Sequence, residues 1–160
     1  METVNLHNDK AIRSILETVL DPEVPVLSVM DLGIVRKILT DDEKVEIHIC
    51  PTYSGCPALD VIATDIKIAL TEADYPEVLV KYVYDEAWTT DMISGAGRKK
   101  LQEYGIAAPQ YDLEKENRSI PCPRCSSENT ERISEFGSTA CKAFHRCKDC
   151  LEPFDYFKCR

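Results

Sequence analysis

Apolar side chains recur at helical spacing in three stretches of the chain. In residues 9–20 they fall at i, i+3, i+4 and i+7 from Ile12 onward, which predicts an amphipathic helix. The same spacing from Leu59 onward predicts a second helix. Asp91–Tyr104 predicts a third, which Gly105 is suited to end because glycine readily adopts the left-handed conformation found at helix C-termini.

Three short runs rich in β-branched or aromatic residues alternate with these helices. Ile34–Leu39 and Val45–Cys50 are separated by the polar residues 40–44, so they predict a hairpin. Val78–Tyr84 predicts a third strand. The order α-β-β-α-β-α predicts an α+β fold, in which helices pack on a small three-stranded sheet.

Composition and charge narrow the class of protein. The chain has 160 residues, of which 44% are hydrophobic and 29% charged, as in ordinary globular proteins. No apolar run approaches the ~18–20 residues of a membrane span, and no secretory signal is visible at the N-terminus, so we expect a cytoplasmic protein without membrane contacts. Residues 1–110 carry 10 basic and 19 acidic side chains. Because such a body repels phosphate, nucleic acid is not an expected partner.

A polar segment divides the chain. Residues 109–120 begin at Pro109, end before Pro121 and show no hydrophobic period. We predict that they link an α/β domain over residues 1–108 to a small domain over residues 121–160. The small domain has few large aliphatic side chains, and a unit of this size needs a disulfide or metal to fold.

Two CxxC pairs in the small domain supply the residues for a metal. They are Cys122, Cys125, Cys147 and Cys150. Two such turns, brought together by a hairpin, offer four thiolates in tetrahedral arrangement, which predicts a zinc ribbon; iron is the alternative for the same ligands. A four-thiolate zinc site is closed, so it stabilises a fold and leaves no open position for catalysis.

The cysteines outside these pairs are less determined by spacing. Cys141 and Cys159 either fill the core of the ribbon or contribute to a second metal or cluster site. Cys50 ends a predicted strand, so it is either a core residue or a second sulfur ligand near Cys56.

Cys56 is the candidate for chemistry in the first domain. It precedes Pro57, and proline is favoured at the first position of a helix, so Cys56 is expected at the N-cap. Unpaired N–H groups and the helix dipole there would stabilise a thiolate, so we predict a lowered pKa and a role in nucleophilic attack or metal capture. The alternative is a cysteine that merely caps the helix.

Two sets of motifs carry a family resemblance. Three segments resemble the iron–sulfur assembly domain shared by bacterial SufT-like proteins and the eukaryotic cytosolic targeting component: Asp21–Pro25, Asp31–Val35 and Gly55–Pro57. Four further segments resemble the PaaD family of phenylacetic acid degradation proteins: PTYSGCPA at 51–58, AWTTD at 87–91, FGSTACK at 136–142 and EPFDYFKC at 152–159. Together the resemblance covers nearly the whole chain.

The resemblance implies a function and residues for it. It implies an accessory factor that matures the iron–sulfur centre of the phenylacetyl-CoA monooxygenase (epoxidase) system, which lies in the reductase component. The oxygenase components, and above all that reductase, are then the expected partners. Cys56 would handle a transient iron–sulfur cluster or iron, with the loop of Asp21 and Asp31 nearby. The motifs also give Cys141 and Cys159 more weight than their spacing does.

Two alternative functions stay open at this point, together with the possibility of a homodimer. The chain could be a non-catalytic structural subunit of the oxygenase. It could be a thiol enzyme, although no base for Cys56 is visible, so an assembly factor is expected rather than a catalyst. A homodimer would bring two Cys56 thiols together at a symmetric interface.

Overall fold

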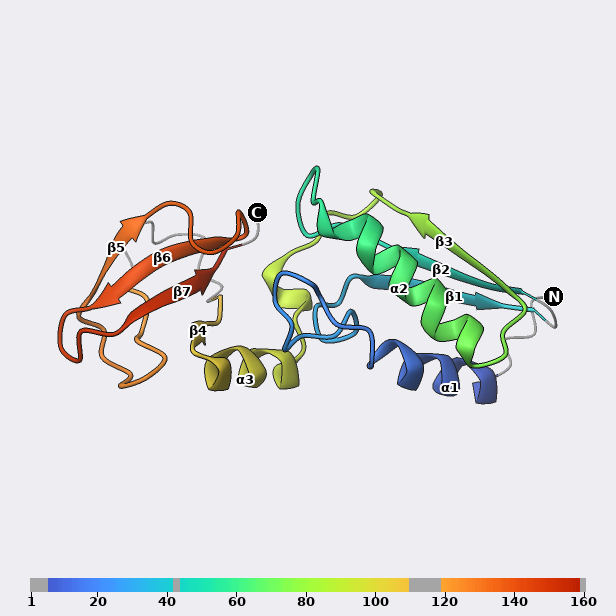
Figure 1. Ribbon diagram of the computed structural model, residues 1–160, viewed down its shortest axis with the longest axis horizontal. Helices are drawn as coiled ribbons and strands as arrows, with labels where there is room; N and C mark the ends of the chain where they lie inside the picture. Colours follow the sequence, from blue (N-terminus) through green and yellow to red (C-terminus); the bar gives the residue numbers. More distant parts are fainter. Residues whose placement is uncertain (1–5, 42–43, 110–118, 159–160) are drawn as a thin grey trace. The chain divides into compact units, whose positions relative to one another are not determined.

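The computed structural model describes residues 6–41, 44–109 and 119–158 (Figure 1). The chain divides into two compact units, Met1–Ser94 and Gly95–Arg160. Among the described residues, no helix combines the length and the apolar character needed to cross a bilayer.

The N-terminal unit is a three-stranded sheet with helices packed on it. Its elements are α1 (Leu6–Leu16), β1 (Val35–Thr40), β2 (Lys44–Ile49), α2 (Ala58–Glu72), β3 (Glu77–Tyr82) and the 3-10 turn η1 (Thr90–Met92). The strands lie in the order β1-β2-β3, with β1 antiparallel and β3 parallel to β2. The parallel pair requires a crossover, which α2 provides (Figure 1). The predicted α+β class and three-stranded sheet are confirmed.

The core of this unit lies between α2 and one face of the sheet. Successive side chains of a strand point to opposite faces, and in β2 every second residue is buried, down to Ile47 and Ile49 at 0% exposure. On α2, Ile66 and Leu70 are equally buried. Full burial of each such side chain stabilises the fold by about 1.5–3 kcal/mol.

The first helix ends earlier than the sequence predicts, at Leu16 rather than residue 20. After it the Val19 N–H bonds back to the Leu16 carbonyl at 3.2 Å, and an isolated bridge joins Leu20 to Ser28. The chain thus leaves the helix through a turn and pairs at Leu20. Val19 is nevertheless only 4% exposed. It is buried, as its helical spacing predicts, although it lies outside the helix.

The third predicted helix is interrupted. Thr90–Met92 form the 3-10 turn η1, Ile93 is extended, and α3 begins only at Gly95 and ends at Tyr104. The extended residue turns the Ile93 side chain into the core, where it is 4% exposed. Gly105 ends α3 with φ of +88°, as predicted.

The C-terminal unit is a four-stranded sheet preceded by α3 (Gly95–Tyr104). Its strands are β4 (Ile106–Ala107), β5 (Thr130–Ser134), β6 (Lys142–Cys147) and β7 (Pro153–Phe157), in the order β4-β7-β6-β5. β4 pairs in parallel with β7, which joins residues that the sequence places in the first domain to the ribbon. Its small core holds Ala107, Cys122, Cys147 and Phe154.

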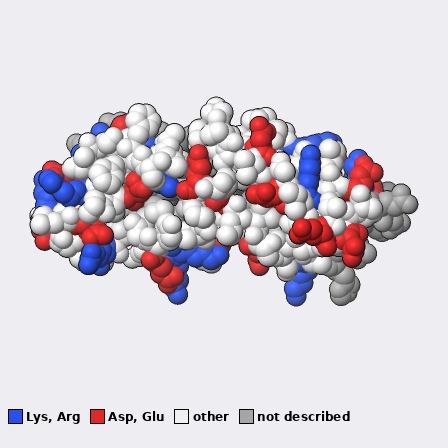
Figure 2. Space-filling view, in the orientation of Figure 1, with Lys and Arg blue, Asp and Glu red and all other residues white. Residues whose placement is uncertain are grey.

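The two units differ in charge. The sequence of the N-terminal unit has 7 basic and 18 acidic side chains, a net of −11, whereas the C-terminal unit has 12 and 10, a net of +2. Figure 2 shows acidic side chains, in red, along the part of the surface that α2 forms. The charge of −9 for the chain therefore arises wholly in the first unit.

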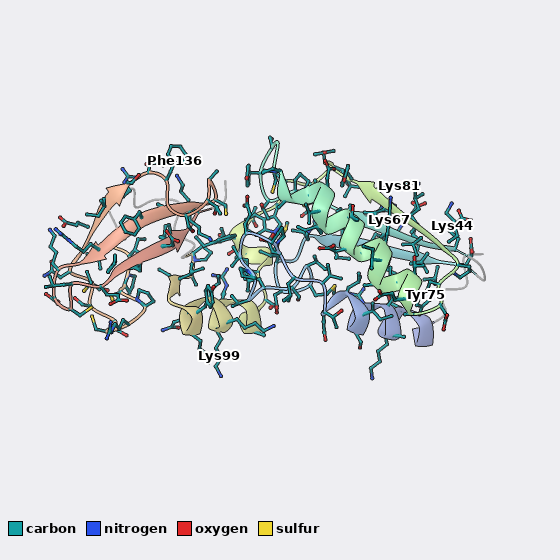
Figure 3. The ribbon with its side chains drawn as sticks, viewed as in Figure 1. Lys44, Lys67, Tyr75, Lys81, Lys99 and Phe136 are labelled. Atoms are coloured by element: carbon teal, nitrogen blue, oxygen red, sulfur yellow. The ribbon has the colours of Figure 1, made fainter. Side chains whose placement is uncertain are left out.

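The less buried face of β2 carries an ionic cluster. Glu46 and His48 alternate with the buried core residues of that strand. The Glu46 carboxylate lies 2.6 Å from His48 Nε2 and 2.7 Å from the Nζ of Lys81, which comes from β3. Lys81 lies on β3 and Lys44 begins β2 (Figure 3).

Candidate functional site

The four cysteines of the two CxxC pairs lie together. Cys122 and Cys125 belong to the turn before β5, Cys147 ends β6, and Cys150 lies in the turn before β7. Their sulfur atoms all lie within 4.8 Å of one another. The hairpin of β6 and β7 thus brings the second turn against the first, as the spacing predicts.

The distances between these sulfur atoms suit a tetrahedral metal. Cys122 Sγ lies 3.7 Å from Cys150 Sγ, and Cys125 Sγ lies 3.6 Å from Cys147 Sγ. Four thiolates at the usual zinc–sulfur distance of about 2.3 Å would lie about 3.8 Å apart in a regular tetrahedron. A disulfide would need about 2.05 Å, so the group fits a metal ion and not two disulfides.

Backbone N–H groups point at the sulfur atoms of this group. The Cys150 N–H donates to Cys147 Sγ at 3.5 Å. The N–H groups of Cys150 and then Asp149 lower the pKa of the Cys147 thiol to about 7, against the effect of burial. Such donors favour the thiolate, which is the form that binds a metal.

Cys141 is the remaining cysteine of the C-terminal unit that the structure describes, and it is not part of the four-cysteine group. Cys141 is 5% exposed, and its Sγ lies 3.0 Å from the Thr139 hydroxyl. Its carbonyl accepts the Lys158 N–H at 2.8 Å. Cys159 lies outside the described residues, so a shared role for these two cysteines stays a prediction.

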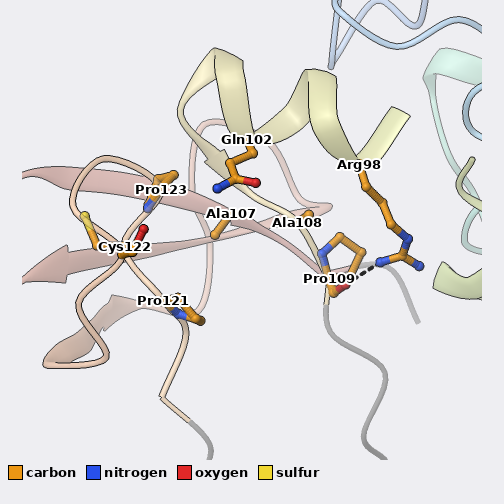
Figure 4. Close-up of a pocket in the computed structure, with 9 residues that line it drawn as sticks. Arg98, Gln102, Ala107, Ala108, Pro109, Pro121, Cys122 and Pro123 are labelled. Atoms are coloured by element: carbon orange, nitrogen blue, oxygen red, sulfur yellow. Dashed lines mark hydrogen bonds between the residues drawn. The ribbon is translucent and has the colours of Figure 1, made fainter. Parts of the chain in front are cut away.

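A pocket of about 280 Å³ lies within the C-terminal unit (Figure 4). Prolines and alanines form much of its lining, with Arg98, Gln102 and Cys122. Arg98 uses Nη1 to bond the Pro109 carbonyl at 2.6 Å. Because small-molecule sites usually reach about 300–1,000 Å³, we assign no ligand to it.

In the N-terminal unit the candidate residues gather at one end of the sheet. The register pairs Val35 with Ile49 and Ile49 with Tyr82, so the start of β1 and the ends of β2 and β3 coincide. The loops before β1, after β2 and after β3 therefore meet at this end (Figure 1). Cys50 and Cys56 both belong to the loop after β2.

Cys56 lies half-buried at the start of α2. Its pKa is raised, contrary to the prediction from its position. Burial is the main cause, and the charges of Glu23 and Asp21 act in the same direction, while bonds from the Ala58 N–H and the Tyr53 hydroxyl oppose them. α2 begins at Ala58 with Pro57 at its N-cap, so Cys56 lies one residue before the predicted N-cap position, and desolvation outweighs the effect of the nearby helix N-terminus.

Cys50 has different surroundings from Cys56. It is 1% exposed, and burial raises the pKa of its thiol. The charge of Arg36 opposes that shift, whereas those of Glu86 and Asp85 add to it. The charged groups that act on Cys50 are thus not those that act on Cys56, and a joint role as ligands remains a prediction.

The two aspartates of the family motifs hold their loop together. Asp21 Oδ1 accepts the backbone N–H groups of Glu23 and Val24, both at 2.8 Å. Asp31 Oδ2 accepts the N–H and hydroxyl of Ser28, both at 3.1 Å. Both aspartates are 8% exposed, and the charge of Asp21 reaches Cys56, so this loop lies near the thiol as the resemblance implies.

Residues 88–94 bond to this loop, and they overlap the AWTTD motif at 87–91, to which the sequence assigns no definite site role. The Trp88 indole N–H bonds the Leu32 carbonyl at 2.7 Å, and the Ser94 hydroxyl bonds Asp31 Oδ1 at 3.1 Å. Gly33 has φ of +68°, and a Cβ there would lie 2.2 Å from the Met92 carbonyl oxygen. Only glycine fits at this close approach. Gly33, within the Asp31–Val35 segment, and the AWTTD motif at 87–91 are the sequence signals for this contact.

Comparison with known proteins places the chain. Residues 9–80 match the model of the iron–sulfur cluster assembly protein family, and residues 107–158 match the PaaD zinc beta ribbon domain. A protein of Escherichia coli K12, whose name makes it one of the subunits of a 1,2-phenylacetyl-CoA epoxidase, is 47% identical over 91% of this chain and 90% of its own length. The chain belongs to the PaaD family. The PaaD resemblance inferred from the motifs is thereby confirmed.

Other relatives of this PaaD-family chain match about half of its length. A Bacillus subtilis protein, the Fe-S protein maturation auxiliary factor YitW, is 37% identical over 49% of this chain and 78% of its own length. An Fe-S protein maturation auxiliary factor of Porphyromonas gingivalis is 31% identical over 56% and 86%. Their names describe those proteins; they make iron–sulfur maturation the function to test here.

Solved structures share the fold of more than half of this PaaD-family chain. A domain of unknown function, DUF59, from Bacillus anthracis superposes with a TM-score of 0.56 and 26% identity, over 60% of this chain and 92% of its own. A conserved hypothetical protein of Thermotoga maritima gives 0.51 and 27%, over 63% and 97%. The roles of Cys56, Cys50, Asp21 and Asp31 remain predictions.

Proposed function

We propose that this chain is an accessory factor that assembles or inserts an iron–sulfur cluster in the phenylacetyl-CoA epoxidase system, and that Cys56 holds the iron or cluster in transit. The proposal depends on the position of Cys56. Cys56 lies half-buried at the start of α2, in a domain whose relatives are named Fe-S maturation factors, joined to a ribbon of the PaaD family.

The chemistry of Cys56 suits temporary binding. Because its pKa is raised, the free thiol is protonated at neutral pH, and binding of iron displaces that proton. Among the described residues, the ribbon cysteines make up the group of three or more ligand atoms that lie together. Cys56 therefore needs further ligands from Cys50, the client or a second chain, and a site with few ligands of its own releases its cargo readily.

The acidic loop beside Cys56 supports a cationic cargo. The carboxylates of Glu23 and Asp21 raise the pKa of Cys56 through their charges. The same field attracts a metal cation. Asp21 and Asp31 act through the loop, which their hydrogen bonds to backbone and serine groups hold in shape.

The ribbon is a structural module stabilised by metal in this proposal. Cys122, Cys125, Cys147 and Cys150 would hold a structural zinc ion, since their spacing fits one. Four thiolates close its coordination sphere, so the ion would stabilise the unit and take no part in transfer. The proposed client is the iron–sulfur reductase component of the epoxidase, and the chain acts as an assembly factor rather than a catalyst.

The test compares Cys56→Ser with Ser54→Ala, a substitution at an exposed position of the same loop. Both chains are purified without oxygen, and zinc, iron and acid-labile sulfide are measured. Epoxidase activity is measured in cells that carry each variant as the only copy. We expect zinc in both, but iron, sulfide and epoxidase activity only with Ser54→Ala. Full epoxidase activity with Cys56→Ser would refute the proposal.

A further variant, Cys50→Ala, tests the second sulfur. Cys50 is 1% exposed, so the folding of the Cys50→Ala chain is first checked by circular dichroism. Loss of iron from a folded Cys50→Ala chain would make Cys50 a ligand together with Cys56. Retained iron would leave Cys50 as a core residue.

The second candidate function is a structural subunit of the epoxidase. The name of the Escherichia coli relative favours it. This function predicts that the chain stays bound to the assembled epoxidase and that activity is indifferent to Cys56→Ser. The same pair of variants therefore separates the two.

A further inference from the structure

A surface patch of aromatic, apolar and acidic side chains borders the end of the sheet where Cys56 lies. We name it the tyrosine patch, and it consists of Asp60, Val61, Tyr82, Tyr84 and Asp85. Its apolar members are well exposed: Tyr84 at 70%, Val61 at 48% and Tyr82 at 40%. Exposed aromatic groups of this kind are enriched where proteins bind one another.

The tyrosine patch joins β3 to the beginning of α2. The Tyr82 hydroxyl donates to Asp60 Oδ1 at 2.7 Å. Asp60 stands in the first turn of α2, two residues after Ala58, whose N–H points at the Cys56 sulfur. A polypeptide bound on the patch would therefore lie next to the thiol.

One ring of the patch is fixed before any partner arrives. The bond to Asp60 raises the pKa of Tyr82 to about 12, so the hydroxyl remains a donor throughout the physiological range. A side chain already held in one position loses less conformational freedom on binding. The position of the Tyr82 ring is thus set in advance, and Tyr84 is the more exposed ring of the patch.

The charge around the patch indicates the kind of partner. The N-terminal unit has a net charge of −11 in sequence. Glu23 and Asp21 act on Cys56, and Glu86 and Asp85 act on Cys50, in each case raising the pKa of the thiol. In a symmetric contact through this patch, a second copy of this chain would set the same acidic groups against each other and be repelled, whereas a basic surface is complementary.

We infer that the tyrosine patch is the docking surface for the client polypeptide, and that the client presents basic side chains around an apolar recess that receives Tyr84. This inference rests on the proposed function, since it places the client where Cys56 can hand over its cargo. Tyr84 supplies the buried contact, and Asp60 and Asp85 supply charge at the rim.

Binding measurements with purified epoxidase components test the inference. Each component is passed separately over the immobilised full chain. We expect the reductase component to bind, Tyr84→Ala to weaken its affinity about tenfold or more, as for a central aromatic contact, and Tyr84→Phe to keep most of it. The matched control is Tyr104→Ala, because Tyr104 of α3 is 57% exposed and belongs to the other unit; it should bind as wild type does.

Salt dependence tests the charge of the partner. Asp85→Asn should weaken binding at about 0.1 M salt but not at about 1 M, because the Debye length falls from about 10 Å to about 3 Å. Glu72→Gln is the control, since Glu72 ends α2 and so lies 12 residues along the helix from Asp60, about 18 Å at 1.5 Å per residue.

The outcomes separate docking from cargo handling. Tyr84→Ala should retain the iron and sulfide of the wild type while losing the client, and Cys56→Ser should do the reverse. Equal affinity of Tyr84→Ala and Tyr104→Ala for the client would overturn the docking surface and leave the role of Cys56 standing. The inference also fails if wild type binds none of the components, or if it binds one of them through acidic groups.

Discussion

At the scale of single residues, the clearest electrostatic effect is at Glu46. Its pKa is lowered to about 2, first by the bond from His48 and then by the bond from Lys81, against a small opposing effect of burial. The three groups come from neighbouring positions of β2 and β3, and the parallel register sets His48 opposite Lys81. One carboxylate thus links two strands of the sheet that carries the site.

This low pKa predicts a dependence of stability on pH. In the unfolded chain Glu46 titrates near its ordinary value of 4.5, so its contribution is fully present above that pH and is lost as the pH falls toward 2. We expect the urea midpoint of wild type to exceed that of Glu46→Gln at pH 7, and the difference to shrink below about pH 4.5. A difference that stays constant down to pH 2 would contradict the assignment.

At the scale of elements, the two cysteine turns share a backbone feature. The residue directly after each CxxC pair has a left-handed conformation: φ is +62° at Ser126 and +64° at Leu151. Neither is glycine, the residue that adopts this conformation without a steric cost. The backbone of both turns is therefore strained. The four-cysteine group and the pairing of the strands keep it in this conformation.

Relief of this strain is a testable change. In Leu151→Gly, loss of about 1–2 kcal/mol of left-handed strain exceeds the about 0.5–1 kcal/mol that glycine adds in backbone entropy. Because Leu151 is 69% exposed, little packing is lost. We expect a higher thermal midpoint for the C-terminal unit, followed by circular dichroism. Ile133→Gly, at an exposed position of β5, should lower the midpoint instead; a decrease in both would contradict the strain.

At the scale of the whole molecule, the two units depend on different sources of stability. The N-terminal unit buries large aliphatic side chains such as Ile47, Ile66 and Leu70 completely. The C-terminal unit buries fewer large side chains, and one cluster of its core consists of Ala107, Phe154 and two of the metal-site cysteines. Without bound metal, this second core is small for a folded unit of its size.

Metal removal should therefore unfold one unit and not the other. We expect a chelator to abolish the protection of β5, β6 and β7 against hydrogen exchange while α2 and β2 keep theirs, because, within the described part of the chain, the four-cysteine group belongs to the C-terminal unit. Exchange is followed by mass spectrometry on the full chain. Equal loss of protection in α2 would show that the first unit also depends on the metal.

The sequence alone was sufficient for the features that depend on local spacing. Hydrophobic periods predicted α2 and the strands of the first sheet, and the CxxC spacing predicted the ligand group whose sulfur atoms lie within 4.8 Å. The motifs indicated the PaaD family. These features are encoded by residues near one another in the chain, so spacing and chemistry suffice to find them.

Tertiary structure decided what depends on distant segments. The pKa of Cys56 rises because burial and the loop of Glu23 outweigh the helix N-terminus. The first helix ends early because Leu20 bridges to Ser28, and residues 106–107 join the ribbon because they pair with β7. Desolvation and strand pairing are set by residues far apart in sequence, and no local pattern carries them.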